Sequence, residues 1–423
     1  MTNLKRTDRS RMRAMNTKLV LDAVRAVETT SQADLIKATK LSTGTIVSIV
    51  RDLRVLGLLV QAGKGASRGG RRPTLLKLNT SAAVVLSCQV GSDTATVCVL
   101  DLGARVLSRR ELVVEREHGP APFMEMLVDC LRQQLHELFP NTLHLPPSSS
   151  SSPPPSTLHP PPPCPSASPV AGLGLSLHGP VDAERGVMLF SEHLGWRDVP
   201  FKDELEKALG VPVFAEAETR AIALAEQCWG AAGGARDFVL IELDTGIGMV
   251  QVLDGKLCRG SHNLAGELGF TAWESGVDAD RRTVVLEQKA SLRAICREAV
   301  QTSLVEGHDL AEETILQSLL DLSSSGDPQA QQILDTAARV LGMVIANVIN
   351  LLDPERILLT GRLVSGPEGG LLDPIRQHVQ AHLVGARDRV PRIEQAVLGA
   401  DAALLGAARL VSDHFFSVDR SKC

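Results

Sequence analysis

Apolar and polar residues alternate with helical periodicity in the first part of the chain. Apolar side chains recur every three or four residues, which predicts helices at 16–27, 32–39 and 42–56. Ser31 and Ser42 stand where the N-caps of the second and third helices are expected. A short turn joins these two helices, as in a helix-turn-helix. The residues expected to face inward on the third helix are Ile46, Val47, Val50, Leu53 and Leu56.

Two short apolar runs, at 58–60 and 74–78, predict a β-hairpin after these helices. The segment between them is rich in glycine and arginine, as in the wing of a winged helix-turn-helix, whose arginines can bind phosphates or enter a minor groove. The alternative is a small helical bundle with a solvated basic loop. The candidate DNA contacts are the polar residues of the third helix and the arginines of the wing: Ser42, Thr43, Thr45, Ser48, Arg51, Arg68, Arg71 and Arg72.

From residue 84 onward the pattern changes to short apolar runs separated by turns. These runs predict strands at 84–90, 96–100 and 105–114, followed by an amphipathic helix at 122–139. Three strands followed by a helix indicate the beginning of an α/β domain.

A segment of low complexity, residues 145–169, consists mainly of proline and serine. Proline lacks a backbone donor and serine favours solvent, so this segment cannot form a core and is predicted to be disordered or polyproline-like. It is expected to be either a tolerated surface insertion or a ligand for a proline-recognition module.

The remaining sequence alternates predicted strands with predicted helices. Two such lobes, each with strands followed by helices, indicate an actin/hexokinase-like bilobal fold. The predicted domains are therefore 1–80, a DNA-binding head, and 81–423, a bilobal body. The strands are expected at 170–177, 211–215, 238–243, 249–253, 357–360 and 393–397, and the helices at 202–209, 216–232, 286–301, 311–322, 328–352, 374–383 and 400–412.

Residues 243–270 hold the densest candidate chemistry, because a glycine-rich DTGIG turn joins the two central apolar runs. Gly246 and Gly248 allow close backbone approach or a positive φ, and their amides could cradle a phosphate. Taken alone, a glycine-rich hairpin is more often only a tight turn, because glycine is the usual residue there.

The charge of the chain is distributed unevenly, although its net value is only −5. Residues 1–80 hold 16 basic and 5 acidic side chains, a net charge of +11, whereas the rest carries −16. A basic head on an acidic body indicates that the head binds a polyanion and the body does not.

The composition favours a protein of the cytoplasm. The eight cysteines form no CxxC pairs, which argues against a disulfide framework and against a thiolate zinc site. The N-terminus lacks an apolar signal core, and no apolar stretch of about 18 residues is free of polar interruption. We therefore expect a soluble protein with no membrane partner.

Several motifs in order resemble those of ROK-family (repressor, open reading frame, kinase) transcriptional regulators of the xylose-repressor type. The resemblance covers nearly all of the chain outside 145–169. It implies a winged helix-turn-helix repressor of carbohydrate-related genes, whose sugar-kinase-like domain senses a sugar or sugar derivative and forms homodimers or homotetramers. The motifs are GGRRP at 69–73, GPVD at 179–182, LGW at 194–196, ALAE at 223–226, and DTGIG with DGKL and NLAGELG within 244–269.

Departures from this family argue against an enzyme. Where the family kinases carry the Asp-x-Gly motif for ATP phosphate and metal, this chain has Gln89. Their catalytic aspartate corresponds to Glu218, and their sugar-binding asparagine to Ala217. A glutamate is about one methylene longer than an aspartate, and misplacing a catalytic group by about 1 Å can lower the reaction rate on the order of 100-fold. Because the metal-side carboxylate is also missing, no catalytic residue and no cofactor are predicted. The alternatives are an ATP-dependent sugar kinase with an appended head, which would use Glu218 as base, and a ligand-independent regulator.

The zinc site that the resemblance implies is not expected here. Its histidine corresponds to Phe270, and its cysteines approximately to Asp278, Asp280 and Val285. Zinc in structural sites requires a closed set of sulfur and nitrogen ligands, which these residues cannot supply, so no metal is predicted.

Part of the family's sugar site is retained. Glu267 and Glu287 match its hydroxyl-binding glutamates and Asn263 is kept, so together with Glu218 they are the candidate ligand-binding residues. They form either a pocket for an altered sugar or phosphosugar, or structural hydrogen bonds in a degenerate pocket. Ligand binding between the lobes would then shift the placement of two heads on a double-stranded, pseudo-palindromic operator.

Overall fold

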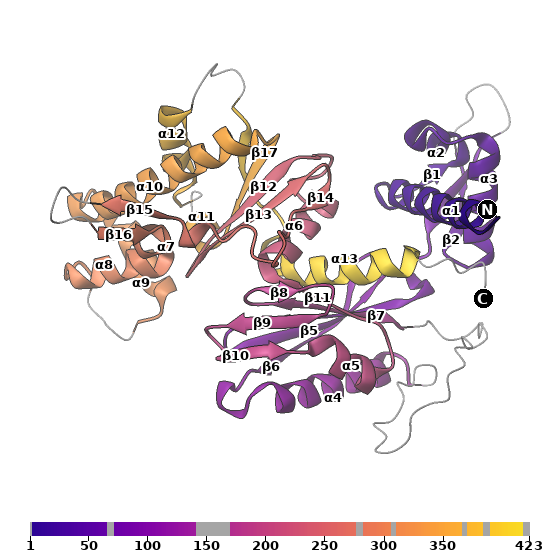
Figure 1. The fold of residues 1–423 in the computed structure, drawn as a ribbon, viewed down its shortest axis with the longest axis horizontal. Coiled ribbons are helices and arrows are strands. Elements are labelled where there is room, and N and C mark those ends of the chain that lie inside the picture. The colour runs from indigo at the N-terminus through magenta and orange to yellow at the C-terminus, as the bar shows by residue number, and fades with distance from the viewer. Residues whose placement is uncertain are drawn as a thin grey trace. The chain divides into compact units, whose positions relative to one another are not determined.

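The computed structural model describes residues 2–65, 72–140, 170–275, 282–305, 310–365, 370–383 and 390–417. The chain forms two compact units (Figure 1): unit 1 comprises Met1–Glu218 and Ala403–Cys423, and unit 2 comprises Thr219–Ala402. The predicted boundary at residue 80 falls inside unit 1, so the domains 1–80 and 81–423 stay a prediction. The predictions for Arg68, Arg71 and the insertion at 145–169 lie outside the described residues.

Unit 1 begins with three helices and a wing, as predicted, but the first helix spans Thr2–Arg25 and not 16–27. Ser31 starts the second helix with a capping box, because its hydroxyl accepts from the amide of Asp34 while the Asp34 carboxylate accepts from the amide of Ser31. The Ser42 hydroxyl accepts from the Thr45 amide and so starts the third helix. The elements are α1 (Thr2–Arg25), β1 (Thr30–Ser31), α2 (Gln32–Thr39), α3 (Thr43–Val55), β2 (Leu59–Lys64) and β3 (Thr74–Leu78), the strands pairing in the order β1-β3-β2.

The buried face of α3 differs from the prediction. Val47 and Leu56 were expected to face inward but are exposed, whereas Ile49 is buried beside Ile46 and Val50. Residues three and four apart share a face of an α-helix, and Val47 lies outside the stripe that Ile46 and Ile49 define.

The sheet of unit 1 has five strands in the order β11-β7-β4-β5-β6. An antiparallel meander runs from β4 to β6, and β7 and β11 add to β4 as parallel strands. Helices α4 and α5 cover one face, and α13 covers the other (Figure 1). The elements are β4 (Val84–Val90), β5 (Thr94–Asp101), β6 (Val106–Val113), α4 (Pro120–Leu138), β7 (Val170–Leu177), α5 (Phe201–Leu209), β11 (Val213–Ala217), α13 (Ala402–Ser417) and a small antiparallel sheet of β8 (Val181–Asp182), β9 (Val187–Ser191) and β10 (Trp196–Val199).

Unit 2 is built on a second five-stranded sheet, in the order β14-β13-β12-β17-β18. The predicted central hairpin is its β12-β13 pair, and β17 and β18 run parallel to β12. The strands are β12 (Phe238–Leu243), β13 (Ile247–Leu253), β14 (Lys256–Leu257), β17 (Arg356–Thr360), β18 (Arg392–Gln395) and a separate pair, β15 (Ala272–Ser275) and β16 (Arg282–Val285).

Helices surround this second sheet. The helix predicted at 286–301 is divided in two, because Ser291 has an extended backbone and its hydroxyl accepts from the Ala294 amide to start a new helix. The helices are α6 (Glu218–Trp229), α7 (Glu287–Ala290), α8 (Leu292–Gln301), α9 (Glu312–Ser324), α10 (Pro328–Leu352), α11 (Arg362–Ser365) and α12 (Leu372–His382). Short 3-10 turns are Thr80–Ala82, Arg116–His118, Leu268–Phe270 and Gly399–Asp401.

Helix α10 is long and apolar enough to cross a bilayer by length and composition alone. In the structure 61% of its most apolar window is buried within the protein, where it belongs to the main hydrophobic core of unit 2. A helix that is apolar all round is also what a protein core requires.

The buried carboxylate of Glu226 holds α6 to the chain segment after β18. It accepts hydrogen bonds from the amides of Val397 and Leu398, both at 2.9 Å, and from the amide of Ala231 at 2.7 Å. Gly230 is required beside it, because an added Cβ would lie 1.9 Å from Glu226 Oε2. One side chain thus satisfies three backbone donors.

Replacing Glu226 with alanine is expected to lower the free energy of unfolding by about 2–4 kcal/mol, because buried amides lose their acceptor. Urea unfolding followed by circular dichroism measures the loss. The matched control is Gln227→Ala on the same helix, whose partly exposed side chain makes one long hydrogen bond, 3.4 Å, to Gly255 O. Equal losses in the two variants would show that Glu226 has no special anchoring role.

Candidate functional site

Helix α3, the third helix of the head, presents part of its predicted polar face. Thr43 and Arg51 are exposed, Thr45 and Ser48 are half-buried, and the Arg51 side chain is 72% accessible with only a 3.4 Å contact to Asp52. Ser42 is engaged in starting the helix, since its hydroxyl accepts from the Thr45 amide. Of the predicted wing arginines only Arg72 is described, and it is exposed. These positions suit contacts to a nucleic acid groove and its phosphates.

A polar cluster in unit 1 forms at the carboxyl ends of its parallel strands. Gln89 lies at the end of β4, His178 follows β7, and Glu218 follows β11. Parallel strands bring their carboxyl ends to one edge of the sheet, which is where ligands bind in α/β folds. Gln89 Nε2 donates to Glu218 Oε1 at 2.6 Å, and His178 Nδ1 lies 3.3 Å from Glu218 Oε2.

Two histidines extend this cluster, and the sequence did not single out His178. The rings of His178 and His193 lie 4.7 Å apart, and Arg116 donates to the backbone oxygen of His193 at 3.0 Å. The only available signal was the position of His178 directly after a predicted strand. Glu218 therefore contacts an amide and an imidazole rather than a second carboxylate that would bind a cation.

The ligand candidates of unit 2 form a separate group around Arg220. The backbone oxygens of Asn263 and Ala265 accept from the buried Arg220 at 2.8 and 3.3 Å. Burial raises the pKa of Glu267, the charge of Arg220 opposes this shift, and the charge of Glu287 adds to it. Unit 2 thus brings Glu267 close enough to Glu287 for their charges to interact. Asn263 has a left-handed backbone, with φ of 60°.

The glycine-rich turn is closed by the protein's own carboxylates. The amide of Thr245 donates to Asp244 Oδ1 at 2.7 Å, and the amide of Ile247 donates to Glu287 Oε2 at 3.0 Å. An added Cβ on Gly246 would lie 3.0 Å from Glu287 Oε2. The glycine therefore makes room for a carboxylate of the protein. The phosphate cradle predicted for the amides of Gly246 and Gly248 stays a prediction.

Arg362, the first residue of α11, fixes this turn. Its amide donates to Asp244 Oδ2 at 2.9 Å, and its Nε donates to Asp244 Oδ1 at 2.9 Å. Its Nη2 reaches the Thr245 hydroxyl at 2.7 Å, which itself donates to Glu312 at 2.8 Å. Burial alone would raise the pKa of Asp244, but the hydrogen bonds from Arg362 and Thr245 lower it, and the same pairing raises the pKa of Arg362.

The positions that correspond to the family's zinc ligands are divided between described and undescribed residues. Phe270 is exposed, and Val285 is the last residue of β16. Asp278 and Asp280 lie outside the described residues. Within the described ranges, no three histidine, cysteine, aspartate or glutamate side chains are grouped so as to hold a metal ion.

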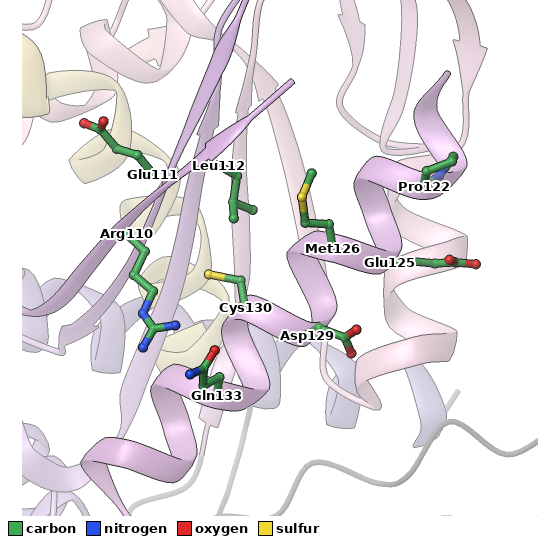
Figure 2. A pocket seen from close by; sticks show the side chains of 9 residues that line it. All are labelled: Arg110, Glu111, Leu112, Pro122, Glu125, Met126, Asp129, Cys130 and Gln133. Carbon is green, nitrogen blue, oxygen red and sulfur yellow. The ribbon is translucent and has the colours of Figure 1, made fainter. Parts of the chain in front are cut away.

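A cavity of about 560 Å³ lies between α4 and β6 of unit 1, away from every predicted site residue (Figure 2). The guanidinium of Arg110 at its edge is paired with Glu137 at 2.6 Å. Burial raises the pKa of the Cys130 thiol there, which keeps it protonated and unreactive. The lining residues are Arg110, Glu111, Leu112, Pro122, Glu125, Met126, Asp129, Cys130 and Gln133.

Comparison with known proteins matches residues 165–414 to the ROK family. Over 412 residues the chain is 24% identical to the xylose repressor of Bacillus spizizenii, covering 97% of this chain and 98% of the repressor. Over 270 residues it is 32% identical to a glucokinase of Halalkalibacterium halodurans, covering 60% of this chain and 80% of the kinase. A crystal structure of a ROK family transcriptional regulator, a homolog of the Escherichia coli MLC protein, has a TM-score of 0.73 at 23% identity, covering 96% of this chain and 97% of that one.

Loss of the Asp244 carboxylate is expected to weaken unit 2 in a pH-dependent way. The pKa of Asp244 is lower in the folded protein than in the unfolded chain, where it is about 3.9. The contribution of Asp244 to the free energy of unfolding is therefore complete above the unfolded pKa and is lost as the pH falls through the folded pKa. Arg362 is 37% exposed, so solvent screening limits the expected loss in Asp244→Asn to about 1–2 kcal/mol at pH 7.

Urea unfolding at pH 7 and at about pH 3 tests this expectation, because the difference between wild type and Asp244→Asn should shrink in acid. Asp373→Asn is the control, since Asp373 forms an exposed helical pair with Arg376. A difference that stays constant with pH would exclude the proposed ionic role of Asp244.

Proposed function

The chain belongs to the ROK family, and from this membership we propose that it is a DNA-binding transcriptional repressor of carbohydrate-related genes, controlled by a sugar or sugar derivative. The observation that carries the proposal is the joining of a winged helix-turn-helix to a kinase-like body in one chain, matched along nearly its full length by a xylose repressor. The basic charge of residues 1–80 supports DNA as the partner.

The head is proposed to bind a double-stranded operator through α3 and the wing. The contacts would come from the exposed Thr43 and Arg51, the half-buried Thr45 and Ser48, and the wing arginines. Ser42 would act mainly by starting α3 and so orienting the helix. Two heads in a homodimer or homotetramer would read a pseudo-palindromic site, because half-site symmetry mirrors protein symmetry.

The chain is a regulator and not an enzyme, consistent with the side chains around its kinase-like positions. Gln89 donates an amide hydrogen bond to Glu218 where catalysis would need a metal-binding carboxylate. In unit 2, Asp244 is engaged by Arg362, and the amides of Thr245 and Ile247 donate to carboxylates of the protein. Turnover of a hexose with release of ADP would contradict this view.

The effector is proposed to be an uncharged sugar that binds through hydroxyl groups. Glu218 in unit 1, and Asn263, Glu267 and Glu287 in unit 2, are the four candidate contacts, to be tested one at a time. Three of the four candidates are carboxylates, which accept hydrogen bonds from hydroxyls but would repel a phosphate. Of the two predicted classes, a free sugar is therefore favoured over a phosphosugar.

A cytoplasmic location without a membrane partner is part of the same proposal. A repressor must reach DNA, and the one described helix that could span a bilayer is largely buried in the core of unit 2. In the described part of the chain no cysteine forms a disulfide, which suits a reducing compartment.

Replacing Arg51 with alanine should weaken binding to the chain's own upstream region by about tenfold, because a base or phosphate contact of the recognition helix is lost. A gel shift against that fragment and against random DNA of equal length, at two salt concentrations, measures it. Arg185→Ala removes an exposed arginine from the body of unit 1 and should bind as the wild type does. If the wild type bound the upstream fragment no more tightly than random DNA, the proposal of a specific repressor would be refuted.

A free sugar should raise the melting temperature of the wild type, since a ligand at 100 times its Kd adds about 2.7 kcal/mol. D-xylose and D-glucose are compared with their phosphate esters by thermal shift. Glu267→Gln should reduce the response to the active sugar, whereas Glu298→Gln, on the exposed face of α8, should retain it. No response to any compound would favour the ligand-independent regulator, and a response confined to the esters would reverse the assignment of effector class.

A further inference from the structure

Helix α13 begins where the chain returns from unit 2 to unit 1. The chain passes between the units after Glu218 and again after Ala402, and α13 starts at Ala402. From there it runs over the sheet of unit 1 (Figure 1). One helix therefore begins at a unit boundary and continues across the body.

The first half of α13 rests directly on the backbone of the sheet. The Ser87 hydroxyl of β4 donates to the backbone oxygen of Leu404 at 2.7 Å, and both groups are buried. On β7, a Cβ added to Gly174 would lie 2.1 Å from the backbone oxygen of Ala407, so no side chain separates helix from strand. Such close packing leaves little room for independent movement, because protein interiors are dense.

The second half of α13 contacts the first helix of the head. Arg409 lies 3.4 Å from Asp22, and the Asp413 carboxylate lies 3.4 Å from Lys18 and 3.6 Å from Arg25. Arg409 also donates to Asp413 at 2.7 Å within the helix. The Arg25 and Arg409 side chains are largely buried, at 7% and 14% exposure, so the group fixes where α1 lies against α13, because a buried charge needs its partner.

Apolar side chains join the same three elements. Residues of the head, of the sheet and of α13 belong to one buried cluster rather than to separate cores. The members that connect them are Val20, Leu21 and Val24 of α1, Val85 of β4, and Leu404, Ala408, Val411 and Phe415 of α13. The head therefore cannot reorient against α13 without exposing apolar surface.

The other end of this contact path is Glu218. Gln89, which donates to Glu218, lies two residues from Ser87 on β4, so both side chains are on the face that α13 covers. The register supports this placement, because Gln89 pairs with Ser176 on β7 and Ser87 pairs with Gly174. Contacts are thus continuous from Glu218 through β4 and α13 to α1, all within unit 1.

We propose that α13 couples Glu218 to the DNA-binding head, so that a change at Glu218 alters the position of α1 and of the recognition helix it supports. The inference rests on the proposed function, since it assigns a route for effector control of DNA binding. Helix α13 packs against α1 and against β4, whose Gln89 donates to Glu218, and Asp413 and Arg409 are the positioning residues at the head.

A double-mutant cycle on the full chain, without DNA or sugar, tests the coupling. Hydrogen-deuterium exchange of the peptide covering 18–25 in α1 is measured in wild type, Glu218→Ala, Asp413→Asn and the double variant. Glu218→Ala should speed exchange of this peptide by about threefold when Asp413 is present, and by less than about 1.5-fold when it is not. Equal factors in the two backgrounds, or no effect of Glu218→Ala in either, would overturn the proposal.

Controls separate coupling from general loosening. Glu137→Gln removes the α4 carboxylate that pairs with Arg110 of β6. This variant should leave the response of α1 to Glu218→Ala unchanged. Exchange in α4 serves as the internal reference. If Asp413→Asn also speeds exchange in α4, Arg409→Gln replaces Asp413→Asn in the cycle. Unequal effects of Glu218→Ala in the two backgrounds would then support the coupling, and equal effects would overturn it. An additive cycle alongside specific operator binding by the wild type would refute the coupling and leave the proposed function standing.

Discussion

The contact between α13 and the sheet of unit 1 constrains much of the molecule. Gly174 permits it, since any larger residue would place Cβ against the backbone oxygen of Ala407. Ser87 adds a buried hydrogen bond to the same helix. Because α13 also pairs with α1 through Arg409 and Asp413, the head and the body of unit 1 share one core and not merely a linker. A helix that follows unit 2 in the sequence thereby completes the packing of unit 1.

Unit 2 retains the shape of a kinase-like lobe while its polar groups satisfy one another. Asp244 and Glu287 accept hydrogen bonds from the amides of Thr245 and Ile247, and Arg362 neutralises Asp244. Such internal pairing offsets the cost of desolvating charged groups. In unit 1, Gln89 similarly turns Glu218 into a hydrogen-bonded carboxylate rather than part of a metal site. In both units the polar side chains near the candidate sites are paired with groups of the protein.

Local patterns predicted the elements well, and their errors have local causes. Ser31 and Ser42 marked helix starts because a hydroxyl satisfies free amides at an N-terminus wherever the helix lies in the fold. Ser291 does the same within a predicted continuous helix and divides it, an effect that apolar periodicity alone conceals. Val47 was placed inward because it is apolar, yet the packing of α3 buries Ile49 instead. Hydrophobicity permits burial, but the direction of the helix face decides it.

The sequence by itself determined the winged head, most strands and helices of the two five-stranded units, the uneven charge and the family's motifs, because each depends on neighbouring residues or on composition. The small strands β8, β9, β10, β15 and β16 were not predicted. Only the tertiary structure decided the partners of the candidate site residues. Gln89 meets Glu218 across 129 positions, and Arg362 meets Asp244 across 118, through the arrangement of strands within each sheet. The residues of α13 do not reveal its role either, because Asp413 pairs with Lys18 and Arg25 of a helix almost 400 residues earlier in the chain. Long-range contacts of this kind follow from topology, which periodicity and spacing do not specify.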